Sequence, residues 1–173
     1  MLLELIRKRR SIRRYLGKPV EAEKVQLLIE AALRAPSSRG LNPWEFIVVD
    51  QAELLEKLAL AKEHSSSFLK NAPLGIVICA DPDRCDVWIE DASIAATYLQ
   101  LVAESLGLGS CWIQIRRRQH SPTKTAAEYV REVLGIPEQL EVEAIIAIGY
   151  PAETLPPHSQ AELDRKKIHV NRY

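Results

Sequence analysis

The apolar positions of the chain follow two patterns, which predict a mixture of helices and strands. Across residues 21–35, apolar side chains recur three and four residues apart, as on one face of a helix, and Pro36 ends the segment. The run WEFIVV at 44–49 alternates and is rich in β-branched and aromatic residues, which favours a strand. Further strands are predicted at 74–80, 110–115 and 142–150. We therefore expect four core strands.

Four other segments have helical character, at 2–10, 51–63, 86–107 and 122–134. The segment 86–107 differs from the others because its apolar positions nearly encircle the helix. Such a helix is buried on most sides, and one sheet in a chain of 173 residues cannot cover all of that surface. A partner subunit is the natural cover. The intermixed order of helices and strands predicts an α+β or α/β fold with a sheet covered by helices.

The C-terminal segment, residues 151–173, has a different composition from the rest of the chain. It carries three prolines and few apolar residues, so it cannot build a core of its own. We expect it to pack over its own subunit or over a partner. No linker, repeat or low-complexity stretch divides the chain, and residues 1–173 are predicted to form a single domain.

Charge and cysteine content exclude several classes of function. The 23 Lys and Arg residues balance 23 Asp and Glu residues, which argues against a general nucleic-acid binder. No apolar run approaches the ~20 residues of a membrane span, and the N-terminal segment does not have the order of a signal peptide. The three cysteines show no CxxC spacing and indicate reduced thiols in a cytoplasmic protein. The four histidines form no metal-ligand pair, so no metal is expected.

The stretch RKRRSIRRY at 7–15 concentrates six basic side chains in a neutral chain. Cations at the end of the first helix would favour its negative dipole end, which accounts for two or three of them. That interpretation does not account for Ser11 and Arg13, which continue past the helix. An anion-binding site is the alternative, and the residues alone support both about equally. If the chain is extended here, Arg9, Ser11 and Arg13 point to one side and Arg10 to the other.

Two more segments have a structural and a functional interpretation. The stretch APSSRGLNPWEF at 35–46 is rich in turn formers, and it would also present hydroxyls, an amide and backbone N–H groups to a polar ligand. The stretch GLGSCWIQ at 107–114 has the wrong spacing for a dinucleotide fingerprint. It indicates a helix end, or a backbone that closely approaches a flat ligand. Taken alone, the structural interpretation is favoured for the stretch at 35–46, and both interpretations stay open for the stretch at 107–114. Cys111 is assigned to the core and Arg116–Arg118 to a solvated loop.

Four segments in this order resemble the nitroreductase family of FMN-dependent oxidoreductases. They are RRSIR (9–13), AALRAPSSRGLNPWEFIVV (31–49), ESLGLGSCWI (104–113) and AIGYPAE (147–153). The resemblance implies an α+β fold with a central, mainly antiparallel sheet flanked by helices. It also implies an intertwined homodimer that holds FMN at the subunit interface.

The same resemblance implies a set of cofactor-binding residues. Arg9, Arg10, Ser11 and Arg13 match residues that hold the FMN phosphate, the ribityl chain and the N1–C2 edge of the flavin. Pro36, Ser37 and Ser38 match a loop that reaches the flavin of the other subunit, and Asn42 sits where many members have glutamine or asparagine. The strand with Trp112 and Ile113 matches the backbone facing the ring. Arg165 in the tail is the candidate for a further phosphate contact, and Gly40 departs from the asparagine of other members.

The expected activity follows from the resemblance. Hydride would pass from NADH or NADPH through flavin N5 to an electron-poor acceptor, such as a nitroaromatic or a quinone, in a ping-pong reaction. No Ser–His–Asp order, paired carboxylates or P-loop is visible, and the flavin carries the chemistry, so no catalytic side chain is assigned. Two alternatives stay open: a dehalogenase or flavin-degrading member of the same fold that does not use NAD(P)H, and a basic binding module without enzymatic activity.

Overall fold

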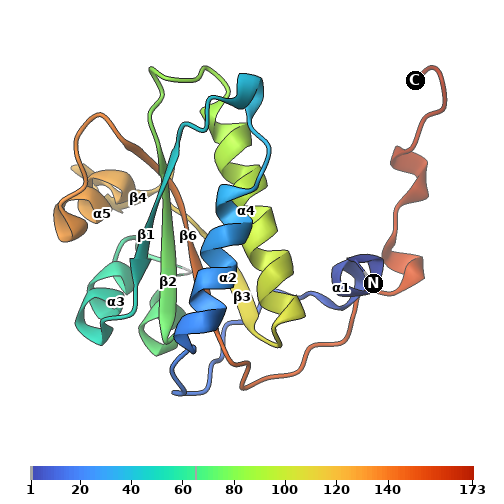
Figure 1. Ribbon diagram of the computed structural model, residues 1–173, viewed down its shortest axis with the longest axis horizontal. Helices are drawn as coiled ribbons and strands as arrows, with labels where there is room; N and C mark the ends of the chain where they lie inside the picture. Colours follow the sequence, from blue (N-terminus) through green and yellow to red (C-terminus); the bar gives the residue numbers. More distant parts are fainter. Residues whose placement is uncertain (1, 65) are drawn as a thin grey trace.

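Four antiparallel strands form the centre of the molecule, and helices cover both faces of this sheet (Figure 1). The structure is a computed structural model, and it describes residues 2–64 and 66–173. The order across the sheet is β1 (Trp44–Val49), β2 (Leu74–Ala80), β6 (Glu141–Gly149) and β3 (Gly109–Gln114). One face packs against α2 (Ala22–Leu33) and α4 (Trp88–Ser105), and the other against α3 (Ala52–Ala59) and α5 (Ala126–Leu134).

The two central strands are apolar except for Glu141 and Glu143 at the start of β6, because both of their faces are covered. Side chains alternate between the faces of a strand. On β2, Ile76 and Ile78 therefore pack with α2 and α4, whereas Val77 packs with α3 and α5. On β6, Ile146 and Ile145 divide in the same way. The sheet thus separates two hydrophobic clusters, and the α+β class expected from the sequence is confirmed.

The sequence located the strands more accurately than the ends of two helices. The helix predicted at 51–63 ends at Ala59, where the chain turns and the Ser66 hydroxyl donates to the Ala59 carbonyl at 2.9 Å. The helix predicted at 122–134 begins only at Ala126. Residues before it form a hairpin of β4 (Gln119–Ser121) and β5 (Lys124–Thr125). Thr125 starts α5 through a reciprocal cap with Glu128, which the wider prediction overlooked.

The long helix α4 presents different surfaces to the sheet and to solvent. Its buried side is rich in alanine, with Ala92, Ala96 and Ala103 around Leu99, so the helix lies close to the strands. The opposite stripe leaves Ile94 and Tyr98 each 39% exposed. Within a single chain, the sheet therefore covers the alanine-rich side of α4, and the apolar stripe with Ile94 and Tyr98 stays partly exposed to solvent.

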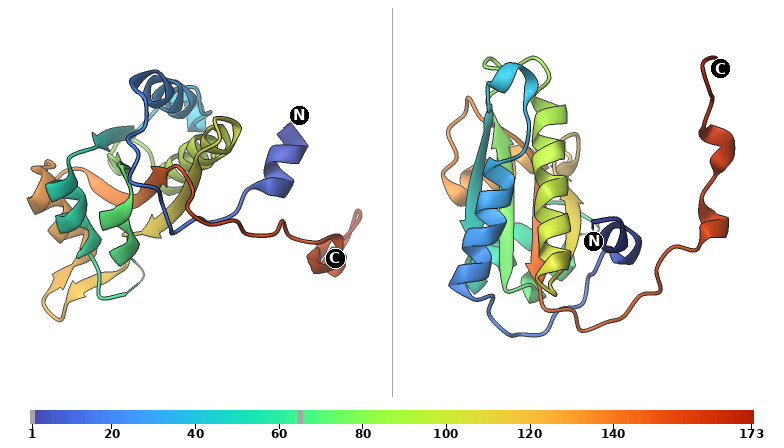
Figure 2. Two further views of the ribbon diagram at one scale, coloured as in Figure 1. Left: turned by 90° about the horizontal axis from the view of Figure 1, so that it is seen from below. Right: turned by 45° about the vertical axis from the view of Figure 1, so that its right-hand side comes forward.

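Two terminal segments extend from this body. The short helix α1 (Leu2–Lys8) packs against α4, where Lys8 forms an ion pair with Glu104 at 3.4 Å. Residues 9–16 then run past the sheet, and we call them the arginine arm. The C-terminal tail, residues 156–173, is exposed throughout and contains two short 3-10 turns, Gln160–Glu162 and Arg165–Lys167. Figure 2 shows the tail extending away from the sheet and its helices.

Candidate functional site

The arginine arm is joined to the outer edge of the sheet at one point. Ser11 pairs with Ser110 of β3 in a parallel bridge, and the Ile12 N–H donates to the Ser110 carbonyl at 3.0 Å. Farther along, Tyr15 pairs with Pro151, and its hydroxyl donates to the Ile12 carbonyl at 2.6 Å. These contacts hold the arm in an extended conformation, in which alternate side chains point to opposite sides.

Arg9, Ser11 and Arg13 share one side of the arm, and all three face the Cys111 thiol. Burial raises the pKa of that thiol, whereas Arg13, a hydrogen bond with the Ser11 side chain and then Arg9 act to lower it. Within the described residues, neither guanidinium forms an ion pair with a carboxylate; the Arg13 guanidinium donates only to the Ser11 carbonyl, at 3.3 Å. Two cations and a hydroxyl therefore converge here, and the Glu153 carboxylate beside the arm accepts the backbone N–H of Arg13, at 2.7 Å, rather than its guanidinium.

The other side of the arm makes different contacts. The Arg10 guanidinium donates to the Pro156 carbonyl of the tail, and Ile12 is buried against Gly109. Arg7 and Arg14 are exposed, and the backbone N–H of Arg14 donates to a Glu153 carboxylate oxygen at 3.1 Å. The structure thus places Arg10 apart from the converging group. The alternation of side chains along an extended chain predicts this separation, whereas the resemblance assigns Arg10 to the same set of cofactor-binding residues.

Two residues beside this group were not found from the sequence. The Phe68 ring lies 5.9 Å from the Arg13 guanidinium. Lys62 lies close to Cys111 and to Arg118; burial lowers the Lys62 pKa, Arg118 lowers it further and Cys111 opposes them. Both residues belong to the segment after α3, and no spacing in the sequence connects them to the arm. Only the fold brings them together. Cys111 lies in the core, as predicted, and the fold places Arg9, Arg13 and Lys62 near its thiol.

Strand β3 offers backbone groups beside the arm because it is an edge strand. Along an antiparallel edge strand, the backbone N–H and C=O groups of successive residues alternate between bonding to the neighbouring strand and pointing away from it. The backbone groups of Ser110 point away from β6 toward the arm. Because the register with β6 is unbroken, the backbone groups of Trp112 and Gln114 point to the same open edge. The Trp112 indole donates to the Gln114 side chain at 2.9 Å. Ile113 is different, because its side chain is 1% exposed in the core.

Residues 36–42 of the turn-rich stretch, which we call the serine loop, lie at the other end of α4. The Ser38 N–H donates to a carboxylate oxygen of Asp91 in the first turn of that helix, at 2.9 Å. The Ser37 hydroxyl donates to the Asn42 side-chain oxygen at 2.6 Å and accepts from the Asn42 N–H at 3.1 Å. An 18-residue helix is about 27 Å long. One chain therefore does not bring Pro36, Ser37, Ser38 and Asn42 to the arginine arm.

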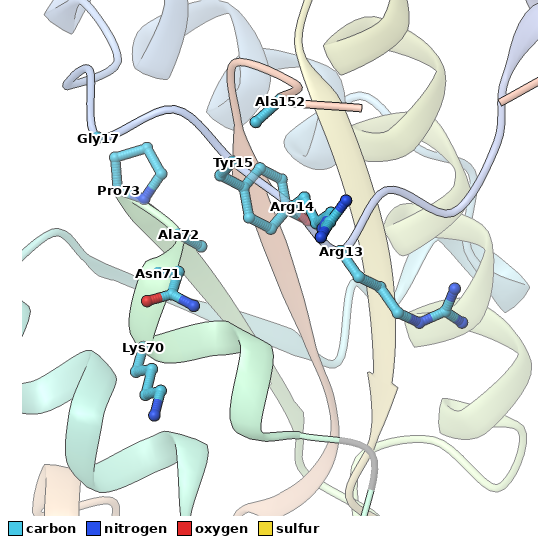
Figure 3. A pocket seen from close by; sticks show the side chains of 9 residues that line it. All are labelled: Arg13, Arg14, Tyr15, Gly17, Lys70, Asn71, Ala72, Pro73 and Ala152. Carbon is cyan, nitrogen blue, oxygen red and sulfur yellow. The ribbon is translucent and has the colours of Figure 1, made fainter. Parts of the chain in front are cut away.

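Two further features lie apart from the converging group. Arg165 belongs to the exposed tail, which Figure 1 shows reaching away from the sheet. An open depression of about 630 Å³ beside the arm is lined by Arg13, Arg14, Lys70 and neighbouring residues. In Figure 3 the Arg13 side chain points away from Lys70 and Pro73. The depression therefore shares Arg13 with the converging group but is not lined by Arg9, Ser11 or Cys111.

Metal-binding clusters and membrane-spanning helices are both absent from the described residues. Within residues 2–64 and 66–173, no three His, Cys, Asp or Glu side chains are grouped closely enough to hold a metal ion. No helix in the same part of the chain is both long and apolar enough to cross a membrane.

Comparisons with known proteins place this geometry in a family. The profile of the Nitroreductase family matches residues 6–65 and 60–150. An FMN-dependent nitroreductase structure from Clostridium difficile is 51% identical, covers 99% of both chains and has a TM-score of 0.97. The NADPH:FMN oxidoreductase from Vibrio harveyi, solved with NAD+, is 28% identical with a TM-score of 0.82, over 99% of this chain and 77% of that one.

A curated relative agrees with these structures. The NADH dehydrogenase of Thermus thermophilus is 31% identical over 198 residues, which span 91% of this chain and 90% of the relative. The antiparallel sheet, the helices on both of its faces and the matches over nearly the whole length are consistent with one another. The chain belongs to the nitroreductase family.

Proposed function

We propose that this protein binds FMN and transfers reducing equivalents from NADH or NADPH to an electron-poor small molecule, such as a nitroaromatic or a quinone. The observation that carries the proposal is the convergence of Arg9, Ser11 and Arg13 beside the open edge of β3. The FMN phosphate carries about −1.5 to −2 charges at neutral pH, and the two guanidinium groups here have no carboxylate partner among the described residues. The names of the related proteins support the same cofactor and reductants.

Each part of the site has a distinct task in this proposal. Arg9, Ser11 and Arg13 hold the anionic and polar groups of FMN by charge-assisted hydrogen bonds. The outward backbone groups of Trp112 and Gln114 meet the polar edge of the ring. We assign Arg10 to the tail contact that it already makes. Arg165 joins the site only if the tail of one subunit reaches the phosphate held by another.

The site also requires the serine loop, and a homodimer supplies it. The arginine arm lies near the C-terminal end of α4 and the serine loop at its N-terminal end. If the exposed stripes around Ile94 and Tyr98 pack together about a two-fold axis perpendicular to the helices, the two copies of α4 run antiparallel. Each serine loop then lies beside the arm of the partner. We therefore propose a homodimer with a flavin site at each end of the shared α4 interface, and a tail that packs on the partner.

The residues of the chain provide binding and electrostatics. FMN supplies the hydride chemistry when it is bound. Arg13 favours the negative charge that accumulates in the site on reduction. The Cys111 thiol stays neutral because burial raises its pKa, so it does not act as a nucleophile.

The visible absorption spectrum of the purified protein, before and after addition of FMN, tests the cofactor. We expect a flavin spectrum at one FMN per chain, and a protein that stays colourless and binds no FMN would refute the proposal. Steady-state oxidation of NADH and NADPH with a panel of nitroaromatics and quinones tests the reaction. Parallel double-reciprocal lines are expected, because one face serves both substrates in turn. A flavoprotein that neither nucleotide reduces would belong to a different reaction class.

A further inference from the structure

The serine loop at residues 36–42 has a backbone that its sequence does not favour. Arg39 and Asn42 have φ angles of 54° and 47°, in the left-handed region. This region is unfavourable for arginine, whereas asparagine tolerates it, and such conformations persist only where surrounding contacts enforce them. The Ser37 hydroxyl holds Asn42 from within the loop, and contacts from outside the loop hold the segment around Arg39.

Asp91 supplies the central contact. Its residue is only 3% exposed, and both of its carboxylate oxygens are occupied. One oxygen accepts the Ser38 N–H at 2.9 Å, and the other accepts the Cys85 thiol at 3.3 Å. The carboxylate also lies in the first turn of α4, where the helix dipole favours negative charge. Asp91 therefore ties the loop, the segment before α4 and the helix itself together.

A second contact holds the loop from its outer side. The Arg39 guanidinium forms an ion pair with Asp86, and one of its nitrogens lies 4.0 Å from the Cys85 sulfur. This pair is exposed, so it contributes little by itself. A buried carboxylate is also weak evidence for stability, since a well-packed apolar residue often serves a core better. What the buried Asp91 does supply is a fixed direction for the Ser38 N–H.

We propose that Asp91 is the positioning residue of the serine loop and holds Ser37 and Ser38 in the conformation that meets FMN in the partner subunit. The inference rests on the proposed function and adds a residue that does not touch the cofactor. It predicts that FMN affinity is proportional to the fraction of time that the loop spends in the binding conformation, so a variant in which this fraction falls binds FMN more weakly.

The experiment compares three variants with the wild-type protein. Asp91→Ala removes both acceptors, Asp91→Asn keeps one acceptor oxygen, and Glu90→Gln changes the neighbouring, exposed carboxylate of the same helical turn. Hydrogen–deuterium exchange is measured across residues 36–42 in protein freed of FMN. The FMN dissociation constant is measured by flavin fluorescence, and sedimentation reports whether the assembly is retained.

We expect Asp91→Ala to speed exchange at Ser38 by at least about tenfold and to weaken FMN binding by roughly 10- to 100-fold, as for a lost hydrogen bond to a charged group. Asp91→Asn should recover most of both losses, and Glu90→Gln should stay within about twofold of the wild type. A folded Asp91→Ala protein with wild-type exchange in the loop, or with wild-type FMN affinity, would overturn the inference. If the wild-type protein binds no FMN at all, the proposed function fails, and the exchange measurement still decides the role of Asp91.

The same hydrogen bond can be removed from the loop side if Asp91→Ala does not fold. Ser38→Pro deletes the donor N–H, and Ser37 already has the extended backbone that a residue before proline adopts, with φ −134° and ψ 157°. Ser38→Ala is the matched control, because it loses the hydroxyl and keeps the N–H. Ser38→Pro should bind FMN about tenfold more weakly than Ser38→Ala. Equal dissociation constants for these two variants would contradict the inference.

Discussion

The side chain of Ile12 lies directly over Gly109, so closely that a Cβ atom at Gly109 would come within 2.8 Å of it. This contact presses the arginine arm onto the first residue of β3, one residue before the bridge between Ser11 and Ser110. The glycine is therefore required for close approach of two segments that are distant in sequence. Through it, the packing of an apolar side chain sets which way Arg9 and Arg13 face.

Gly109→Ala should destabilise the protein and displace the arm. The added methyl group meets the Cβ of Ile12, which cannot move without its backbone, and overpacking of this kind costs about 1–3 kcal/mol. Urea denaturation measures the loss, and FMN binding should weaken as well. Gly17→Ala is the matched control, because nothing lies within 4 Å of its added Cβ. A Gly109→Ala protein as stable as Gly17→Ala would show that the arm is not held in this way.

Arg9→Ala and Arg13→Ala should each weaken FMN binding by roughly 10- to 150-fold. Each removes a charge-assisted hydrogen bond worth about 1.5–3 kcal/mol, and about 1.4 kcal/mol corresponds to a factor of ten. Arg7→Ala and Arg14→Ala, at exposed positions of the same stretch that lie outside the converging group, should change the dissociation constant by only a few-fold.

Titration of the four apo-proteins with FMN, followed by flavin fluorescence, gives these constants. Equal losses at all four positions would indicate a diffuse basic surface. Unchanged binding in both Arg9→Ala and Arg13→Ala would remove the converging group from the flavin site.

The sequence predicts the strands and the parity of the arm because both depend on local alternation. β1 and β2 lie where the apolar runs place them. The same rule puts Arg9, Ser11 and Arg13 on one side, as the structure has them. Strand alternation also explains why Ile113 points into the core while its neighbour Trp112 faces the open edge with its backbone.

The rest of the site depends on contacts that no local pattern encodes. Lys62 and Phe68 reach the arm only because the segment after α3 folds back beside β3. Asp91 occupies one position in a long apolar helix, and its partner Ser38 lies far from it in sequence. Tertiary packing decides such pairs, so the converging side of the arm could be predicted from the sequence and its neighbours could not.

A charge placed in the exposed stripe of α4 should separate the proposed dimer. Tyr98→Glu puts a carboxylate at a position that is 39% exposed in one chain and buried in the proposed interface. Burying unpaired charges near the two-fold axis is costly, so sedimentation at micromolar concentration should show monomers with little bound FMN. Leu60→Asp changes a more exposed apolar position at the end of α3, on the opposite face of the sheet, and should leave the assembly intact. A stable Tyr98→Glu dimer would contradict the arrangement.

Glu143 should make the stability of the protein fall as pH rises. The residue is 4% exposed, and burial raises its pKa above the ordinary value of 4.5; a hydrogen bond from Gln114 and the charge of Arg116 oppose this, and Glu90 adds to it. The folded state therefore keeps a proton on Glu143 at pH values where the unfolded chain has released it. The stability that this bound proton confers is lost as pH rises from about 4.5 through the higher folded pKa.

Glu143→Gln keeps an acceptor for Gln114 and cannot ionise. The urea midpoint of this variant, relative to the wild type, should therefore increase with pH and level off once Glu143 is ionised. Glu141→Gln on the same strand, whose side chain is 43% exposed and pairs with Arg131 at 3.3 Å, should lack this rise. A constant difference between Glu143→Gln and the wild type from pH 4 to 8 would mean that Glu143 does not titrate with a raised pKa.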